Sequence, residues 1–474
     1  MDEFNFNRVL PEEVGISGKT VANFVERAVK ELDSLHSFML VRHGKVAAEL
    51  WWPPYAPEHP HLLFSLSKSF TSTAIGLAIS EGKFKIDDPV IGFFPRKRLP
   101  DEISDYLRSM TIRHLLTMSS GHGTCSMEGV KRNKFKGDWV KLILSEPIVH
   151  KPGTRFVYNS GATYLLSAIL DTVTGEHLLQ YLEPRLFSPL GIKDAMTEKS
   201  PDGTHVGGWG MSLKTEDIAR FGQLYLQKGK WGDQQLVPES WVKDATSFQI
   251  SNAHAGQLDW AQGYGYQFWR SQNNAYRGDG AFGQYCLVMP DQDAVIAITS
   301  GIQNMQRVLD LIWEVLLPGM QPAQLPPAEP VKMISPCMPK ATGATSSTLT
   351  AQLNGRSWKL TENLGLFNQA VFRFDRKGVM LELKTADATE TLAAGYGEWR
   401  FGQIRLENDP ARKYAASAGW VSPEELNIAI CCYEQPYNIL LKCMFGQDKL
   451  AMEMKFNVTF WSGAWPVING SPSP

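Results

Sequence analysis

The stretch Phe-Ser-Leu-Ser-Lys-Ser-Phe at residues 64–70 is the most informative part of the sequence. It leads into a segment of small and apolar residues, 67–81, that ends at Gly82, which is typical of a buried helix with a C-terminal glycine cap. Ser65 and Lys68 are three residues apart, so on a helix their side chains lie on one face, one turn apart. A serine hydroxyl attacks well only when a base takes its proton, and a lysine can do so when its pKa is lowered. By itself the tetrapeptide also fits an N-cap serine followed by a solvated lysine.

The patterns around this stretch alternate between strands and helices. Residues 37–51 predict a β-hairpin with its turn at His43-Gly44, and residues 162–173 and 215–227 predict helices. Later segments predict three strands and a closing helix, at 265–269, 284–289, 294–299 and 308–317. This order predicts one α+β domain built on an antiparallel sheet.

A proline-rich segment marks a change in composition. Seven prolines occur between Pro318 and Pro339, which predicts an extended linker. Beyond it the pattern contains only strands, which favours a small β-barrel or a sandwich. We therefore expect a first domain at 1–318, a linker at 319–347 and a C-terminal barrel domain at 348–474. The predicted strands are 357–360, 370–374, 379–383, 390–393, 398–401, 415–421, 424–432, 438–445 and 449–456.

Composition excludes several classes of protein. The 474 residues include 47 basic and 49 acidic ones, a net charge of -2, which gives no long-range field for nucleic acid or an anionic membrane. The sequence contains no run of 18 apolar residues, and the acidic start lacks the apolar core of a signal peptide. Six cysteines without CxxC spacing indicate reduced thiols rather than a metal site. We expect a soluble, cytoplasmic enzyme without metal or other cofactor; no feature specifies its oligomeric state.

Four segments together carry a resemblance to a known family. Residues 65–90, 112–121, 151–170 and 208–222 are similar, in order and spacing, to the motif regions of the β-lactamase-related serine hydrolases. This family comprises class C β-lactamases, penicillin-binding proteins of the DD-peptidase type, and related esterases and amidases. The resemblance covers residues 8–318. It implies a β-lactamase/DD-peptidase-like α+β domain, here followed by a small all-β barrel of lipocalin-like type.

The resemblance also implies roles for individual residues. Ser65 becomes the nucleophile that forms an acyl-enzyme, and Lys68 and Tyr158 share the work of general base and acid. A tyrosine can act as a base when cations lower its pKa, and Lys68 is the candidate cation. Ser160 stands where the family has Asn or Ser, so we expect it to hydrogen-bond Lys68 or the substrate amide. By the same register, the backbone N–H groups of Ser65 and Ala281 form the oxyanion hole.

The third motif departs from the family pattern. Where the family usually shows Lys-Thr-Gly or His-x-Gly, this chain has Gly278-Asp279-Gly280. The glycines permit close backbone approach, and we expect all three residues to contact substrate. The cation that helps to hold the carboxylate of a β-lactam is missing, and Asp279 would repel that carboxylate. This form is similar to esterase-like members and to hydrolases of 6-aminohexanoate oligomers.

We therefore expect a serine hydrolase that cleaves an ester or amide in a small molecule or short peptide, and that is not an efficient β-lactamase. One alternative is a sensor or ligand-binding protein that binds a ligand, or is acylated by it, without turnover. In another, the barrel is the functional part and binds lipid or peptide. A nucleophile elbow of the Gly-x-Ser-x-Gly type and a His-Glu-x-x-His zinc motif are both absent from the sequence.

A few further residues are weaker candidates. His59 and His61 could bind metal, although a solvated histidine pair in a proline-rich loop is the simpler interpretation. His122 could face the cleft. Four aromatic residues could wall an apolar acyl pocket or could pack in the core: Trp51, Trp52, Tyr55 and Trp260.

Overall fold

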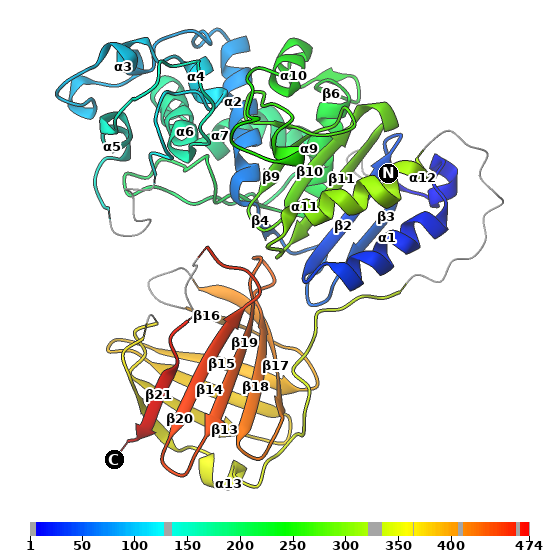
Figure 1. Ribbon diagram of the computed structural model, residues 1–474, viewed down its shortest axis with the longest axis vertical. Helices are drawn as coiled ribbons and strands as arrows, with labels where there is room; N and C mark the ends of the chain where they lie inside the picture. Colours follow the sequence, from blue (N-terminus) through cyan, green and yellow to red (C-terminus); the bar gives the residue numbers. More distant parts are fainter. Residues whose placement is uncertain are drawn as a thin grey trace.

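The first part of the chain is organised by a seven-stranded sheet (Figure 1). The computed structural model describes residues 6–127, 135–320, 334–363, 365–405, 411–460 and 465–473. The strand order is β1-β3-β2-β11-β10-β9-β8, and every neighbouring pair is antiparallel except β1 with β3. The strands are β1 (Asn7–Arg8), β2 (Leu35–Arg42), β3 (Lys45–Trp51), β8 (Trp269–Arg270), β9 (Tyr276–Gly280), β10 (Gln284–Met289) and β11 (Ala294–Ser300).

Both faces of this sheet are covered by helices, because its central strands are apolar on both sides. In β11, Val295 and Ala297 point into the core that contains α2, α6 and α9, whereas Ile296 and Ile298 point into the core that contains α1 and α11. This alternation is the two-residue period of a strand. The helices are α1 (Gly18–Glu31), α2 (Ser67–Ser80), α6 (Ser160–Thr174), α9 (Thr215–Leu226) and α11 (Met305–Leu311).

Helix α2 lies at the centre of the helical region. Every residue from Ser67 to Ala78 is buried, as expected for a helix that is apolar or small all round. Shorter elements surround it: α3 (Asp105–Ser109), α4 (Ile112–Leu116), α5 (Trp139–Ser145), α7 (Leu178–Leu182), α8 (Ser188–Leu190) and α10 (Glu239–Thr246). The remaining short elements here are β4 (His61–Leu62), β5 (Ser212–Leu213), β6 (Lys230–Trp231), β7 (Gln234–Gln235) and α12 (Leu317–Gly319). None of the helices in the described ranges is long and apolar enough to cross a bilayer.

The second part of the chain is a closed β-barrel (Figure 1). Its strands follow the order β15-β14-β13-β12-β21-β20-β19-β18-β17-β16, and pairing of β15 with β17 closes the sheet. The prediction of a barrel is therefore confirmed, and the sandwich alternative is wrong. The elements are α13 (Thr350–Leu353), β12 (Ser357–Leu360), β13 (Gln369–Phe374), β14 (Gly378–Lys384), β15 (Thr389–Tyr396), β16 (Arg400–Ile404), β17 (Arg412–Trp420), β18 (Glu425–Cys431), β19 (Asn438–Phe445), β20 (Leu450–Phe456) and β21 (Ile468–Pro472).

The barrel touches the first part of the chain through specific hydrogen bonds. The Leu62 N–H donates to the Glu434 carbonyl at 2.9 Å, and the Tyr55 hydroxyl donates to the Gln435 carbonyl at 3.1 Å. Asn438 Nδ2 donates to Ser34 Oγ at 2.7 Å. Of the predicted linker, residues 321–333 lie outside the described residues, and the domain boundaries stay a prediction.

Candidate active site

Ser65 lies in a tight turn at the head of α2. The turn spans Phe64–Leu66, and Phe64 has a left-handed φ of 48°, a costly conformation for a residue with a side chain. The Ser67 hydroxyl stabilises this turn, because it donates to the Phe64 carbonyl at 2.6 Å and accepts from the Met211 N–H at 3.1 Å. The turn therefore presents Ser65 at the N-terminal end of a buried helix, where backbone N–H groups face outward.

Lys68 is held one helical turn from Ser65. Its side chain is only 2% exposed, and Nζ donates to Ser65 Oγ at 3.0 Å and to the Gly208 carbonyl at 2.6 Å. Nζ also lies 4.9 Å from the centre of the Tyr158 ring. The structure thus brings together the serine and lysine of the tetrapeptide and the tyrosine of the second motif.

Tyr158 immediately precedes α6 and lies next to Ser65 and Lys68. Its ring stacks on Trp269 with centroids 5.4 Å apart, and it lines the same pocket as Ser65. Burial, reinforced by the nearby Asp279 charge, raises the pKa of Tyr158 well above its usual value. The expectation that Lys68 would lower this pKa is wrong, because the effect of burial dominates. Tyr158 is therefore a neutral phenol in this state.

Strand β9 approaches the serine turn closely at two glycines. A Cβ atom on Gly280 would lie 1.9 Å from the Leu63 carbonyl oxygen, and one on Gly278 would lie 2.4 Å from Leu66 Cδ1. The residue between them has its side chain on the other side of the strand, because successive strand residues alternate sides, and it lines the pocket that also contains Ser65. That residue is Asp279.

Asp279 is paired with a cation that sequence reasoning did not assign to it. Arg277, on the same side of β9, is fully buried, and its Nε donates to Asp279 Oδ2 at 3.0 Å. The guanidinium lies 4.5 Å from the centre of the Trp260 ring, and Nη1 donates to the Asp259 carbonyl at 3.1 Å. Burial still raises the pKa of Asp279, against the opposing effect of Arg277. Two-residue spacing on a strand could have indicated this pair.

A pocket of about 340 Å³ contains most of the predicted site residues. Ser65, Tyr158, Ser160, Asp279 and Ala281 all line it. Large apolar side chains complete its wall, from positions that lie far apart in the sequence: Phe64, Trp209, Trp260, Trp269, Met305 and Phe460. Of these, only Trp260 was a candidate from the sequence. Phe460 comes from the barrel part of the chain.

The other aromatic candidates lie away from this pocket. Trp52 and Tyr55 belong to the core that contains α1 and α11, whereas Trp51 packs against the core that contains α2. His122 is buried, and its Nδ1 lies 2.9 Å from Ser120 Oγ, so it acts in packing rather than in the pocket.

The histidine pair considered as a metal site is divided between two environments. His61 Nε2 lies 3.0 Å from His36 Nδ1, and burial lowers the pKa of His61 to about 4, so this ring is neutral. His59 instead lies against Tyr433, with ring centres 4.4 Å apart. Within the described ranges, no group of three or more His, Cys, Asp or Glu side chains is placed to hold a metal ion.

Comparison with known proteins identifies the family. A sequence model of the Beta-lactamase family matches residues 27–316, more than half of the chain, and the chain therefore belongs to that family. It is 26% identical over 285 residues to the 6-aminohexanoate-dimer hydrolase of Paenarthrobacter ureafaciens, covering 55% of this chain and 71% of the relative. It is 25% identical over 310 residues to penicillin-binding protein 4 of Amycolatopsis lactamdurans, covering 56% of this chain and 80% of that relative.

A solved structure extends the similarity of fold to the barrel. The octameric penicillin-binding protein homologue from Pyrococcus abyssi aligns over 96% of this chain and 99% of its own, with a TM-score of 0.52 and 16% identity. The fold that this comparison shows is a β-lactamase-like part followed by a closed barrel.

Proposed function

We propose that the protein is a serine hydrolase that cleaves an ester or amide bond through an acyl-enzyme on Ser65. The observation that carries the proposal is the 3.0 Å contact between Lys68 Nζ and Ser65 Oγ, at the head of a buried helix and at the edge of a pocket. A serine and a lysine at this distance fit the arrangement of a nucleophile and its base. Membership of the Beta-lactamase family supports the same chemistry.

In the proposed reaction, the Lys68 amine accepts the Ser65 proton as Oγ attacks the carbonyl carbon. The backbone N–H groups of Ser65 and Ala281 stabilise the oxyanion that forms. The phenol of Tyr158, kept protonated by burial, gives its proton to the leaving group and regains one from the Lys68 ammonium. Water then attacks the acyl-enzyme by the reverse path and restores Ser65. Ser160, on the pocket wall, hydrogen-bonds the substrate.

Asp279 directs substrate choice in this proposal. Its carboxylate lines the pocket between Gly278 and Gly280, whereas Arg277 is fully buried and cannot reach a substrate. A substrate carboxylate at this place would meet a negative oxygen, so esters and amides without one, or with an amine, are preferred. We expect nitrocefin to be turned over at least about 100-fold more slowly than p-nitrophenyl acetate. Comparable rates for the two substrates would contradict this role of Asp279.

The test of the proposal is the variant Ser65→Ala. We expect it to lose p-nitrophenyl acetate hydrolysis and covalent labelling by a fluorophosphonate. Ser80→Ala is the matched control, because Ser80 lies at the far end of α2 and its hydroxyl donates to the Leu77 carbonyl. Unchanged labelling of Ser65→Ala would refute the proposal. A single stoichiometric burst of p-nitrophenol from the wild type, without steady turnover, would favour the non-turnover alternative instead.

A further inference from the structure

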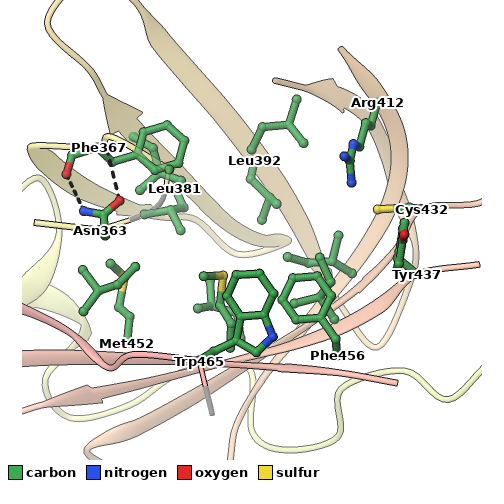
Figure 2. Close-up of a pocket in the computed structure, with 18 of the residues that line it drawn as sticks. Asn363, Phe367, Leu381, Leu392, Arg412, Cys432, Tyr437, Met452, Phe456 and Trp465 are labelled. Atoms are coloured by element: carbon green, nitrogen blue, oxygen red, sulfur yellow. Dashed lines mark hydrogen bonds between the residues drawn. The ribbon is translucent and has the colours of Figure 1, made fainter. Parts of the chain in front are cut away.

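The barrel contains a large apolar cavity of about 620 Å³ (Figure 2). Its wall is formed mainly by aliphatic and aromatic side chains, among them Leu381, Leu392, Met452, Phe456 and Trp465. Cavities of this size and character are typical of sites that enclose an apolar small molecule.

The cavity occupies only the half of the barrel that faces the β-lactamase-like part. The half next to α13 is filled by four large aromatic rings that contact one another: Trp358, Phe372, Trp420 and Phe445. At the opposite end, β18 and β19 are joined by the turn that includes Glu434 and Gln435, which hydrogen-bond the first part of the chain. The hollow end of the barrel therefore faces the β-lactamase-like part of the chain (Figure 1).

One side chain lines both the barrel cavity and the Ser65 pocket. Phe460 belongs to the wall of each, and its ring is 64% exposed. Its ring centre lies 5.8 Å from that of Phe64, which precedes Ser65, and 4.6 Å from that of Phe282, which follows Ala281. Val458, another cavity residue, packs against the same two phenylalanines. A continuous apolar surface thus runs from the serine turn into the barrel.

We propose that the substrate carries a long apolar chain, and that this chain extends from Ser65 past Phe460 into the barrel cavity. The inference rests on the proposed function, because it assigns a substrate class to the same serine. The chain is unbranched or slender, since it must pass the ring of Phe460 between the two spaces. The barrel thereby serves as the specificity pocket of the hydrolase.

The test compares esters that differ only in chain length. Full burial of a methylene corresponds to about a fourfold gain in kcat/KM. We expect p-nitrophenyl octanoate to exceed p-nitrophenyl acetate by about 100-fold or more. If the long chain belongs to the alcohol part of the ester, the kcat/KM of octyl acetate should exceed that of ethyl acetate by a similar factor, which a pH-stat measures.

Two variants of β20 distinguish an effect of filling the cavity from a general effect of placing a tryptophan in the barrel. Met454 lines the cavity, whereas Glu453 beside it is exposed on the outer surface of the barrel. We expect Met454→Trp to lower the ratio of octanoate to acetate kcat/KM by at least about tenfold, and Glu453→Trp to leave it unchanged. The ratio is independent of the fraction of folded enzyme, because both substrates report on the same molecules. A Met454→Trp ratio within about twofold of wild type, in both ester series, would overturn the inference.

Binding is measured apart from catalysis in the Ser65→Ala background. We expect the fluorescence of the methyl ester of cis-parinaric acid, which carries no carboxylate for Asp279 to repel, to rise saturably with this protein, and the added Met454→Trp substitution to weaken that binding at least about tenfold. The absence of saturable binding would overturn the inference. If Ser65→Ala still hydrolyses the acetate, the proposed function fails whatever the probe shows. If the acetate reaction is lost but chain length has no effect, the substrate class alone fails.

Discussion

The substitution Gly280→Ala tests whether the approach of β9 to the serine turn sets the catalytic geometry. A Cβ atom at this position would lie 1.9 Å from the Leu63 carbonyl oxygen, and real Cβ contacts do not fall below 3.0 Å. The strand or the turn must therefore move apart by about 1 Å. Ala281 is the next residue and its N–H belongs to the proposed oxyanion hole, so the hole moves relative to Ser65. A misplacement of about 1 Å costs on the order of 100-fold in rate.

The assay is steady-state hydrolysis of p-nitrophenyl acetate, with kcat based on active sites titrated by a fluorophosphonate. We expect kcat to fall about 100-fold while KM changes less, because the oxyanion forms only in the transition state. Gly92→Ala is the matched control, since a Cβ atom there meets nothing within 4 Å. A folded Gly280→Ala variant with kcat within about twofold of wild type would refute this reasoning.

Three further predictions concern the base, a buried acid and the barrel core. Lys68→Ala should lower kcat by about 100-fold to 10,000-fold, and Lys68→Arg should not restore it, because a guanidinium does not release its proton; recovery in ester hydrolysis by the Arg variant would contradict the role of Lys68. Burial raises the pKa of Asp217 from 3.8 to about 6 despite its ion pair with Arg220, so the unfolded chain releases this proton at lower pH than the folded one. In urea unfolding, the free energy of unfolding of the wild type should therefore fall relative to that of Asp217→Asn as the pH rises from about 4 to 6. A difference between the two proteins that does not change with pH would count against this linkage. In the same assay, Trp358→Ala should lower the free energy of unfolding by about 3–5 kcal/mol, because Trp358 is fully buried. Phe401→Ala, at a position that is 59% exposed, should lower it by less than about 0.5 kcal/mol. Equal losses in the two variants would show that the filled half of the barrel is not its core.

Local sequence signals were sufficient where the chain's own pattern determines the structure. The helix predicted at 67–81 is α2 at Ser67–Ser80, and the hairpin predicted at 37–51 is β2 and β3 with the turn at His43-Gly44. Strand β21 was not predicted, because Ile468 is its only large apolar residue and Gly470 and Pro472 disfavour a strand. Its pairing with β12 and β20 overrides these local preferences.

The candidate site shows the same division between local and non-local information. Ser65, Lys68 and Tyr158 could be proposed from motifs, because each motif is continuous in the sequence. The protonation state of Tyr158 could not be predicted from the sequence, because it depends on burial by residues such as Trp269 that come from elsewhere in the chain. Phe460 was also out of reach, because the barrel and the serine turn meet only in three dimensions.

The hydrogen bond from the Leu62 N–H to the Glu434 carbonyl has a consequence for protein engineering. Leu62 lies three positions before Ser65, so the backbone that presents the serine is tied directly to a turn of the barrel. A chimaera with a barrel from another protein would have to reproduce the position of this turn to within a hydrogen-bond length. The barrel is therefore not an interchangeable cassette, and changes in its turn and in the segment before the serine must be designed together.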